Sequence, residues 1–173
     1  MRFTPHVTVA TVVEDQGRFL LVEELADNRA VFNQPAGHLE ADESLTQAAL
    51  RETFEETGWE IELTGVIGIY LYTSPANGIT YQRVCFAGKP LRHIAESELD
   101  QGIIGPRWMS REEIAGCSER LRSHLVLRCV DDCIKGPLFP LELIRDRCAI
   151  RANSPLPDRI AVFQSWPCCA AHV

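Results

Sequence analysis

Hydrophobic and polar positions alternate over the first part of the chain in the manner of β-strands. Residues 6–13 alternate in part and are rich in β-branched side chains, which favours a strand. The sequence Glu-Asp-Gln-Gly at 14–17 is typical of a turn, so residues 18–24 are the expected hairpin partner. A loop at 26–29 and a short extended segment at 32–36 follow. The start of the chain therefore predicts strands and turns.

The pattern then changes to that of a helix, which is expected to stop at Gly58. Glycine suits the left-handed position that ends many helices. Ser44 and Gln47 could form a capping box at the helix start, and Asp42 is a competing N-cap. Apolar side chains lie on two sides of the predicted helix, so it is expected to be sandwiched between other elements.

The remaining pattern predicts further strands and two more helices. Gly65 and Gly68 interrupt a long apolar stretch and suggest bends or a bulge. Ser110 opens a helix, and Glu113 would complete its capping box. In chain order, the predicted segments are a strand at 61–73, a turn at 75–78, a strand at 79–86, an acidic loop at 91–105, a short strand at 106–109, the helix that begins at Ser110, and a helix at 123–135.

A helix between two groups of strands predicts an α/β (α+β) fold in which a mixed sheet lies between helices, as an α/β/α sandwich. The chain has 173 residues, which is enough for one domain with a real core. We expect that domain to span residues 1–150. Residues 151–173 are rich in proline and are expected to form an irregular C-terminal tail.

Charge and composition exclude several classes of protein. The net charge of −7 argues against a nucleic-acid partner, and it disfavours an anionic substrate unless a metal ion inverts the local field. No apolar run approaches the length of a membrane span, and the N-terminal residues predict no signal peptide. The seven scattered cysteines are then expected to be free thiols in a reducing cytoplasm, with no function attached to Cys168 and Cys169.

The residues with candidate chemistry gather on the predicted helix before Gly58. At about 100° per residue, Glu52, Glu55 and Glu56 fall within one arc of about 100°. Crowded carboxylates repel each other, but they suit Mg²⁺ or Mn²⁺, which prefer oxygen ligands. The alternative is an ordinary solvated helix face in which Arg51 and Glu55 form an i,i+4 ion pair.

The spacing around these carboxylates resembles the signature of the Nudix hydrolase family. Gly37, five residues, Glu43, seven residues and then Arg51-Glu52-Thr53-Phe54-Glu55-Glu56-Thr57-Gly58 fill its charged and glycine positions. Thr53 departs from the aliphatic residue that is usual there, which weakens a packing contact and leaves the chemistry unchanged. The resemblance implies a mixed sheet between helices and the hydrolysis of a diphosphate linked to another moiety.

The same resemblance implies roles for individual residues. Glu52 and Glu56 would be metal ligands, with Glu52 also a candidate base. Glu55 would join them or accept a hydrogen bond from Arg51, and the Gly37 carbonyl would add a ligand. Glu43 is expected to order the loop.

Other residues are weaker candidates. A further loop acid often completes such a site, and Glu96, Glu98 and Asp100 are the candidates, although each could simply be solvated. His38 could touch a phosphate or merely be exposed. A pocket for a heteroaromatic ring could be lined by strand residues that could equally belong to the core, namely Gln34, Tyr70, Tyr72, Tyr81 and Arg83.

The segments at 4–10, 32–40, 81–86 and 136–144 resemble those of a subgroup of bacterial Nudix phosphatases, and this resemblance spans about residues 3–145. That resemblance implies Mg²⁺-dependent release of orthophosphate from hydroxymethylpyrimidine pyrophosphate, thiamine pyrophosphate, and nucleoside tri- and diphosphates. Two alternatives remain open: a housecleaning nucleoside triphosphate pyrophosphatase, and an inactive Nudix domain that binds a ligand as a regulator. Both a monomer and a homodimer are compatible with the sequence.

Overall fold

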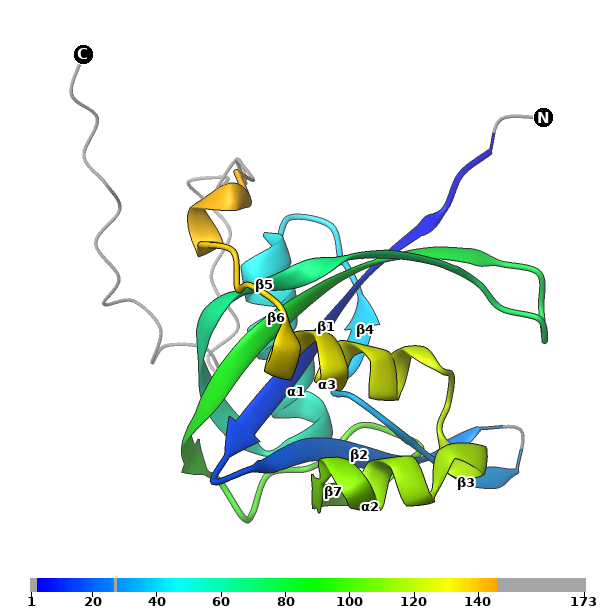
Figure 1. Cartoon of the computed structure of the whole chain (residues 1–173), viewed down its shortest axis with the longest axis vertical. Helices are drawn as coiled ribbons and strands as arrows, with labels where there is room; N and C mark the ends of the chain where they lie inside the picture. Colours follow the sequence, from blue (N-terminus) through cyan, green and yellow to red (C-terminus); the bar gives the residue numbers. More distant parts are fainter. Residues whose placement is uncertain (1–2, 27, 146–173) are drawn as a thin grey trace.

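In the part of the chain that the structure describes, strands form most of the first half, and two of the three α-helices lie in the second half (Figure 1). The computed structural model describes residues 3–26 and 28–145, so the tail predicted at 151–173 lies outside the described residues. The elements are β1 (His6–Asp15), β2 (Arg18–Ala26), β3 (Arg29–Asn33), β4 (Ala36–His38), α1 (Leu45–Thr57), β5 (Trp59–Thr73), β6 (Thr80–His93), β7 (Ile103–Ser110), α2 (Arg111–Gly116), α3 (Leu125–Lys135), and the 3₁₀ turns η1 (Ser118–Arg120) and η2 (Leu141–Leu143).

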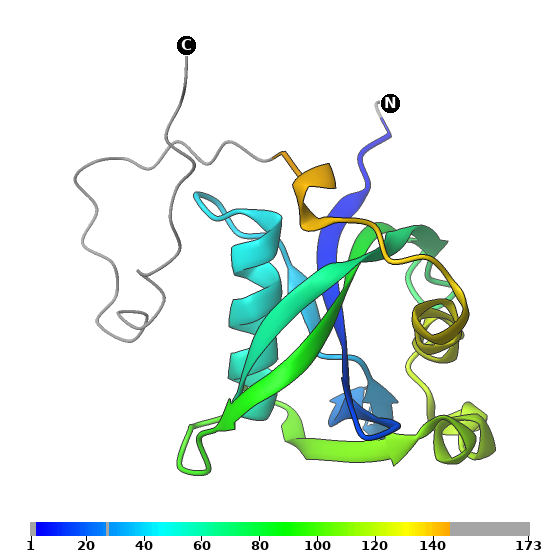
Figure 2. The ribbon, with the colours of Figure 1, turned by 60° about the vertical axis from the view of Figure 1, so that its left-hand side comes forward.

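The strands form a mixed sheet in the order β3-β2-β1-β6-β5, with β4 paired to β1 and β7 paired to β2. β1 and β6 run parallel, and the other pairs are antiparallel. Figure 2 shows α1 and α3 on opposite sides of this sheet. The predicted sandwich is therefore confirmed. Within residues 3–26 and 28–145, no helix has the length and apolar character that a membrane span needs.

β1 is buried on both faces because it lies at the centre of the sandwich. Val9 and Val13 pack in the cluster that contains Ala48 and Ala49 of α1. Ala10 and Val12 pack in the opposite cluster, which contains four buried residues of α3. Burial on both faces explains why this strand alternates only in part.

Local signals in the sequence are confirmed where they determine the ends of α1. Ser44 caps the helix and forms a capping box with Gln47, so Asp42 is not the N-cap. Gly58 has φ 70°, the left-handed conformation that glycine adopts most readily. Gly65 and Gly68 lie at register shifts between β5 and β6, as predicted.

The predicted loop at 91–105 is wrong at both ends. β6 continues to His93, and β7 begins at Ile103 rather than at Pro106. Pro90 lies opposite Ile61 beside a register shift, where a missing N–H is tolerated, and Arg92 forms an ion pair with Glu60 at 2.9 Å. The polar residues at the end of β6 are therefore part of a strand, and the connection to β7 is short.

Thr53 is fully buried where α1 crosses β1, and its hydroxyl is satisfied. That hydroxyl donates to the Ala49 carbonyl at 2.7 Å, so it accepts the hydrogen bond from the Thr11 hydroxyl, also 2.7 Å away. The residue that departs from the usual signature thus forms a polar contact between the helix and the sheet.

We expect T53V to lower the free energy of unfolding by about 1–3 kcal/mol, because the buried Thr11 hydroxyl would lose its acceptor. The double variant T11V/T53V should recover most of that loss, since both partners become apolar. Urea denaturation of the wild type and both variants measures the effect. A double variant no more stable than T53V would contradict it.

Candidate active site

Arg51 connects the loop before α1 to the acidic side of the helix. Its Nε and Nη2 donate to the two oxygens of Glu43 at 3.0 and 2.7 Å, and Nη2 also donates to the His38 carbonyl at 3.1 Å. Its Nη1 donates to Glu52 Oε1 and Glu55 Oε2, both at 2.9 Å. Arg51 therefore orients both carboxylates, and Glu43 orders the loop from a position just before the helix.

These hydrogen bonds shift the pKa values of Glu43 and Arg51. Burial alone would raise the pKa of Glu43, but hydrogen bonds from Arg51 and from the Glu40 N–H hold it below its usual value. The Glu43 carboxylate, followed by those of Glu55 and Glu52, raises the pKa of Arg51. Arg51 and Glu43 therefore stay charged.

Three carboxylates meet at the end of α1. Glu52, Glu55 and Asp100 each offer an oxygen, and these oxygens lie within 4.8 Å of one another. Asp100 reaches the helix because its backbone N–H donates to the Glu55 carbonyl at 3.0 Å. Of the three predicted loop acids, the structure brings Asp100 into this group and leaves Glu96 and Glu98 out of it.

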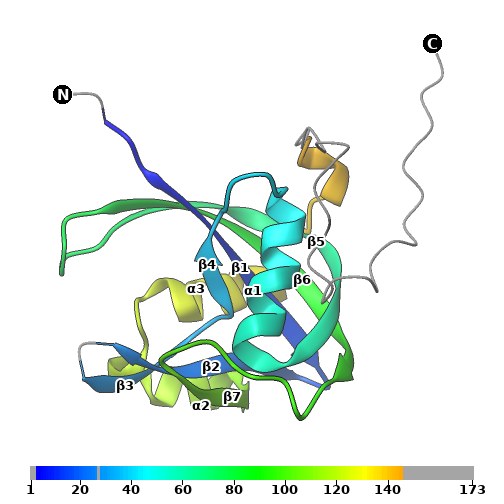
Figure 3. The same cartoon turned by 180° about the vertical axis from the view of Figure 1, so that it is seen from behind.

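The backbone of β4 passes directly beside α1 and this acidic group (Figure 3). Gly37 is paired with Val9 of β1, and a Cβ atom at Gly37 would lie 2.0 Å from Glu52 Oε1. Only glycine leaves room for that carboxylate. An all-oxygen donor set beside bare backbone fits a hard divalent cation such as Mg²⁺ or Mn²⁺.

Glu56 lies deeper than the other acids. Its Oε2 accepts a hydrogen bond from the Ala36 N–H at 2.8 Å. Burial, together with the charges of Glu52, Glu24 and Asp100, raises its pKa to about 8 against that hydrogen bond. Burial also raises the pKa of Glu52, against the effect of Arg51. The Glu56 carboxyl would ionise fully at neutral pH only beside a further positive charge.

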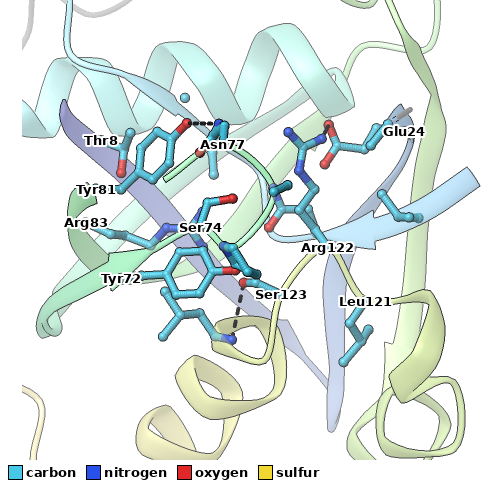
Figure 4. Close-up of a pocket in the computed structure, with 18 of the residues that line it drawn as sticks. Thr8, Glu24, Tyr72, Ser74, Asn77, Tyr81, Arg83, Leu121, Arg122 and Ser123 are labelled. Atoms are coloured by element: carbon cyan, nitrogen blue, oxygen red, sulfur yellow. Dashed lines mark hydrogen bonds and ion pairs between the residues drawn. The ribbon is translucent and has the colours of Figure 1, made fainter. Parts of the chain in front are cut away.

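A cavity of about 900 Å³ begins at β4 and extends over the sheet. It is lined by the predicted residues Gly37, His38, Tyr72, Tyr81 and Arg83. Figure 4 shows Tyr72, Tyr81 and Arg83 together on one side of it. The cavity is also lined by residues that no sequence pattern selected, among them Thr8, Glu24, Asn33 and Arg122.

His38 lies at the exposed edge of this cavity. Its ring centroid is 5.5 Å from that of His6 and 6.1 Å from that of Tyr81. His38 is thus exposed, its neighbours are the rings of His6 and Tyr81, and its contact with a phosphate stays a prediction.

Two residues expected to line a pocket lie elsewhere. Gln34 is fully buried, and its Nε2 donates to the Val126 carbonyl of α3 at 2.6 Å. Tyr70 packs against the core, and its hydroxyl donates to Asp132 at 3.0 Å. Both side chains form hydrogen bonds with α3, and neither lines the cavity.

In metal-free protein, we expect the free energy of unfolding to fall as pH rises from about 4.5 to about 8. Over that range the folded protein retains on Glu56 a proton that the unfolded chain has lost, because the pKa rises from 4.5 to about 8 on folding. The E56Q variant should lack this part of the pH dependence. Chemical denaturation in EDTA at several pH values provides the measurement, and identical slopes in both proteins would contradict the prediction.

Comparison with known proteins agrees with this geometry. The family model of the NUDIX domain matches residues 2–127 of this chain. The chain is 42% identical over 144 residues to proteins named Phosphatase NudJ from Escherichia coli K12 and Shigella flexneri, an alignment that covers 83% of this chain and 93% of each relative.

Solved structures show the same relationship. A NUDIX hydrolase from Nitrosomonas europaea superposes with a TM-score of 0.82 at 39% identity, covering 84% of this chain and 99% of that one. The NUDIX domain of Shewanella oneidensis NrtR, solved with ADP ribose, shares the fold, with a TM-score of 0.59 at 20% identity over 77% and 88% of the two chains. This chain therefore belongs to the Nudix family and is a hydrolase that acts on phosphorus-containing anhydrides.

Proposed function

We propose that this chain is an Mg²⁺-dependent phosphatase that releases orthophosphate from small diphosphates and triphosphates. The substrates proposed are hydroxymethylpyrimidine pyrophosphate, thiamine pyrophosphate, and nucleoside tri- and diphosphates. The observation that carries the proposal is the group of carboxylate oxygens from Glu52, Glu55 and Asp100, held within 4.8 Å of one another. The similarity to phosphatases over most of the chain supports the type of product.

The residues proposed to hold Mg²⁺ are Glu52, Glu55, Glu56 and the Gly37 carbonyl, with Asp100 as the loop acid. A divalent cation supplies charge neutralisation for phosphoryl oxygens and lowers the pKa of the attacking water. Arg51 fixes Glu52 and Glu55 through its Nη1, so these carboxylates keep their positions without reorganisation. Glu52 is the proposed base, since it lies between Arg51 and the backbone of Gly37.

The cavity supports a substrate with an organic group beside its phosphates. Gly37 and His38 line the cavity at the end nearest the carboxylates, the Tyr81 ring lies next to His38, and Tyr72 lies opposite Tyr81 on the neighbouring strand. A diphosphate bound at the carboxylates would therefore leave its organic group over the sheet. Mn²⁺ is a possible substitute for Mg²⁺, because its ligand preferences are similar.

Two alternatives differ in a measurable product or in its absence. A housecleaning nucleoside triphosphate pyrophosphatase would release inorganic pyrophosphate. A regulatory domain would bind its ligand without turnover, and the intact set of acidic residues around Arg51 argues against that. The cytoplasmic location and the choice between monomer and homodimer stay predictions.

We expect E52Q to lower Mg²⁺-dependent turnover by at least two orders of magnitude, since loss of one group that stabilises the transition state costs about 10²–10³ in kcat. Phosphate release from thiamine pyrophosphate and nucleotides, without added phosphatase, measures it. The exposed Glu112→Gln variant is the control and should keep full activity. Full activity in folded E52Q would refute the proposed site, and pyrophosphate as the product would favour the housecleaning enzyme.

The choice of Asp100 over its neighbours can be tested separately. D100N should raise the Mg²⁺ concentration for half-maximal activity by about 10- to 100-fold, the usual cost of disturbing a metal site. E98Q removes a carboxylate from the same connection and should change nothing, because Glu98 lies outside the group of oxygens. Equal effects of the two substitutions would mean that Asp100 contributes only general charge.

A further inference from the structure

Residues that line the cavity on two opposite sides carry buried polar atoms without hydrogen-bond partners. Within residues 3–26 and 28–145, buried side-chain atoms of four lining residues have no hydrogen-bond partner: Thr8 Oγ1, Glu24 Oε1, Asn33 Oδ1 and Arg83 Nη1. Buried polar groups in folded proteins are nearly always paired, because leaving one unpaired costs free energy. Side chains of this kind in a cavity wall can pair with a ligand of complementary donors and acceptors by turning toward it.

Among these residues Arg83 is the cation, and its buried Nη1 has no hydrogen-bond partner in the described part of the chain. It lies on β6, directly across from Thr8 of β1, and Thr8 lies directly across from His38 of β4. Adjacent strands are about 4.8 Å apart, so the backbones of Arg83 and His38 are separated by about 10 Å. Phosphates bound at Glu52, on the far side of β4, therefore lie away from Arg83. Arg83 is then placed to contact the organic group of the substrate.

Glu24 lies on the other side of the cavity and presents an acceptor. Its Oε2 forms an ion pair with Arg122 Nη1 at 3.2 Å, which fixes the carboxylate. Its Oε1 is buried and has no hydrogen-bond partner among the described residues. Figure 4 shows Glu24 and Arg122 across the cavity from Arg83 and Tyr81.

We propose that Arg83 and Glu24 select the organic group of the substrate, which rests on the function proposed above. Arg83, with the Thr8 hydroxyl beside it, donates to an acceptor such as a ring carbonyl or ring nitrogen. Glu24 accepts a hydrogen bond from an amino group on the opposite edge, and Tyr72 and Tyr81 provide aromatic faces next to the ring. The favoured class is an amino-substituted heteroaromatic ring, such as cytosine, guanine or an aminopyrimidine.

Matched nucleotides test the role of Glu24. CTP and UTP differ in an amino group against a carbonyl, and GTP and ITP differ in one amino group. The wild type should prefer CTP and GTP in kcat/KM by about 10- to 100-fold, the range for one hydrogen bond to a charged group. Equal values within both pairs would overturn the proposal.

The E24Q variant provides the sharper test. Arg122 should bind the amide oxygen, so the amide NH₂ would point into the cavity as a donor and the preference should shrink or reverse toward UTP. The control is E62Q, which makes the same change of charge at an exposed ion pair with Lys89. An unchanged preference in active E24Q overturns the proposal and leaves the proposed function standing.

R83M tests the other side of the cavity and does not depend on E24Q folding. It should raise KM for all four nucleotides by about tenfold or more with little change in kcat, while inhibition by inorganic tripolyphosphate stays the same. K89M removes an equal charge from the same strand and should have no effect. Weaker tripolyphosphate inhibition in R83M would place Arg83 at the phosphates and overturn the proposal. If wild-type protein hydrolyses none of these nucleotides or thiamine pyrophosphate with Mg²⁺, the proposed function itself fails.

Discussion

Repulsion between carboxylates is the constraint around which this end of the molecule is built. Glu52, Glu55 and Asp100 converge within a few ångströms, and Glu56 is buried behind them. Among the described residues, Arg51 forms the ion pairs with Glu52 and Glu55 through its Nη1. Its Nη2 pairs with Glu43 in the loop before the helix. One cation cannot balance four acids, so the arrangement is complete only with further positive charge.

Much of this end of the fold could be predicted because its interactions are local in the chain. The Arg51 contacts join residues no more than thirteen positions apart. The capping box of Ser44 and the left-handed Gly58 are likewise set by a few neighbours. Spacing along the chain can specify contacts of this kind, which is why the sequence predicts the carboxylates at the end of α1.

Contacts between distant segments had no such signal. Glu96, Glu98 and Asp100 are equivalent as a charge pattern, and a backbone hydrogen bond to α1 selects Asp100. Glu24 is an ordinary strand residue until η1 and α3 place Arg122 beside it. Gln34 was expected at a pocket, but the carbonyl of α3 that it binds is ninety-two positions away. The length of β6 was underestimated for the same reason, since its polar end is stabilised by pairing with β5.

The connection between β6 and β7 is attached to the last turn of α1 at two points. The Ile94 N–H donates to the Gly58 carbonyl at 2.9 Å, and the Asp100 N–H donates to the Glu55 carbonyl at 3.0 Å. A Cβ at Gly58 would lie 2.5 Å from Ser97 Oγ, so the segment also packs closely against the helix end. Insertion or deletion of one residue between these two points would move the later attachment by up to about 3.3–3.6 Å. Relatives that preserve this chemistry should therefore tolerate length changes in the β5–β6 turn far better than in this connection.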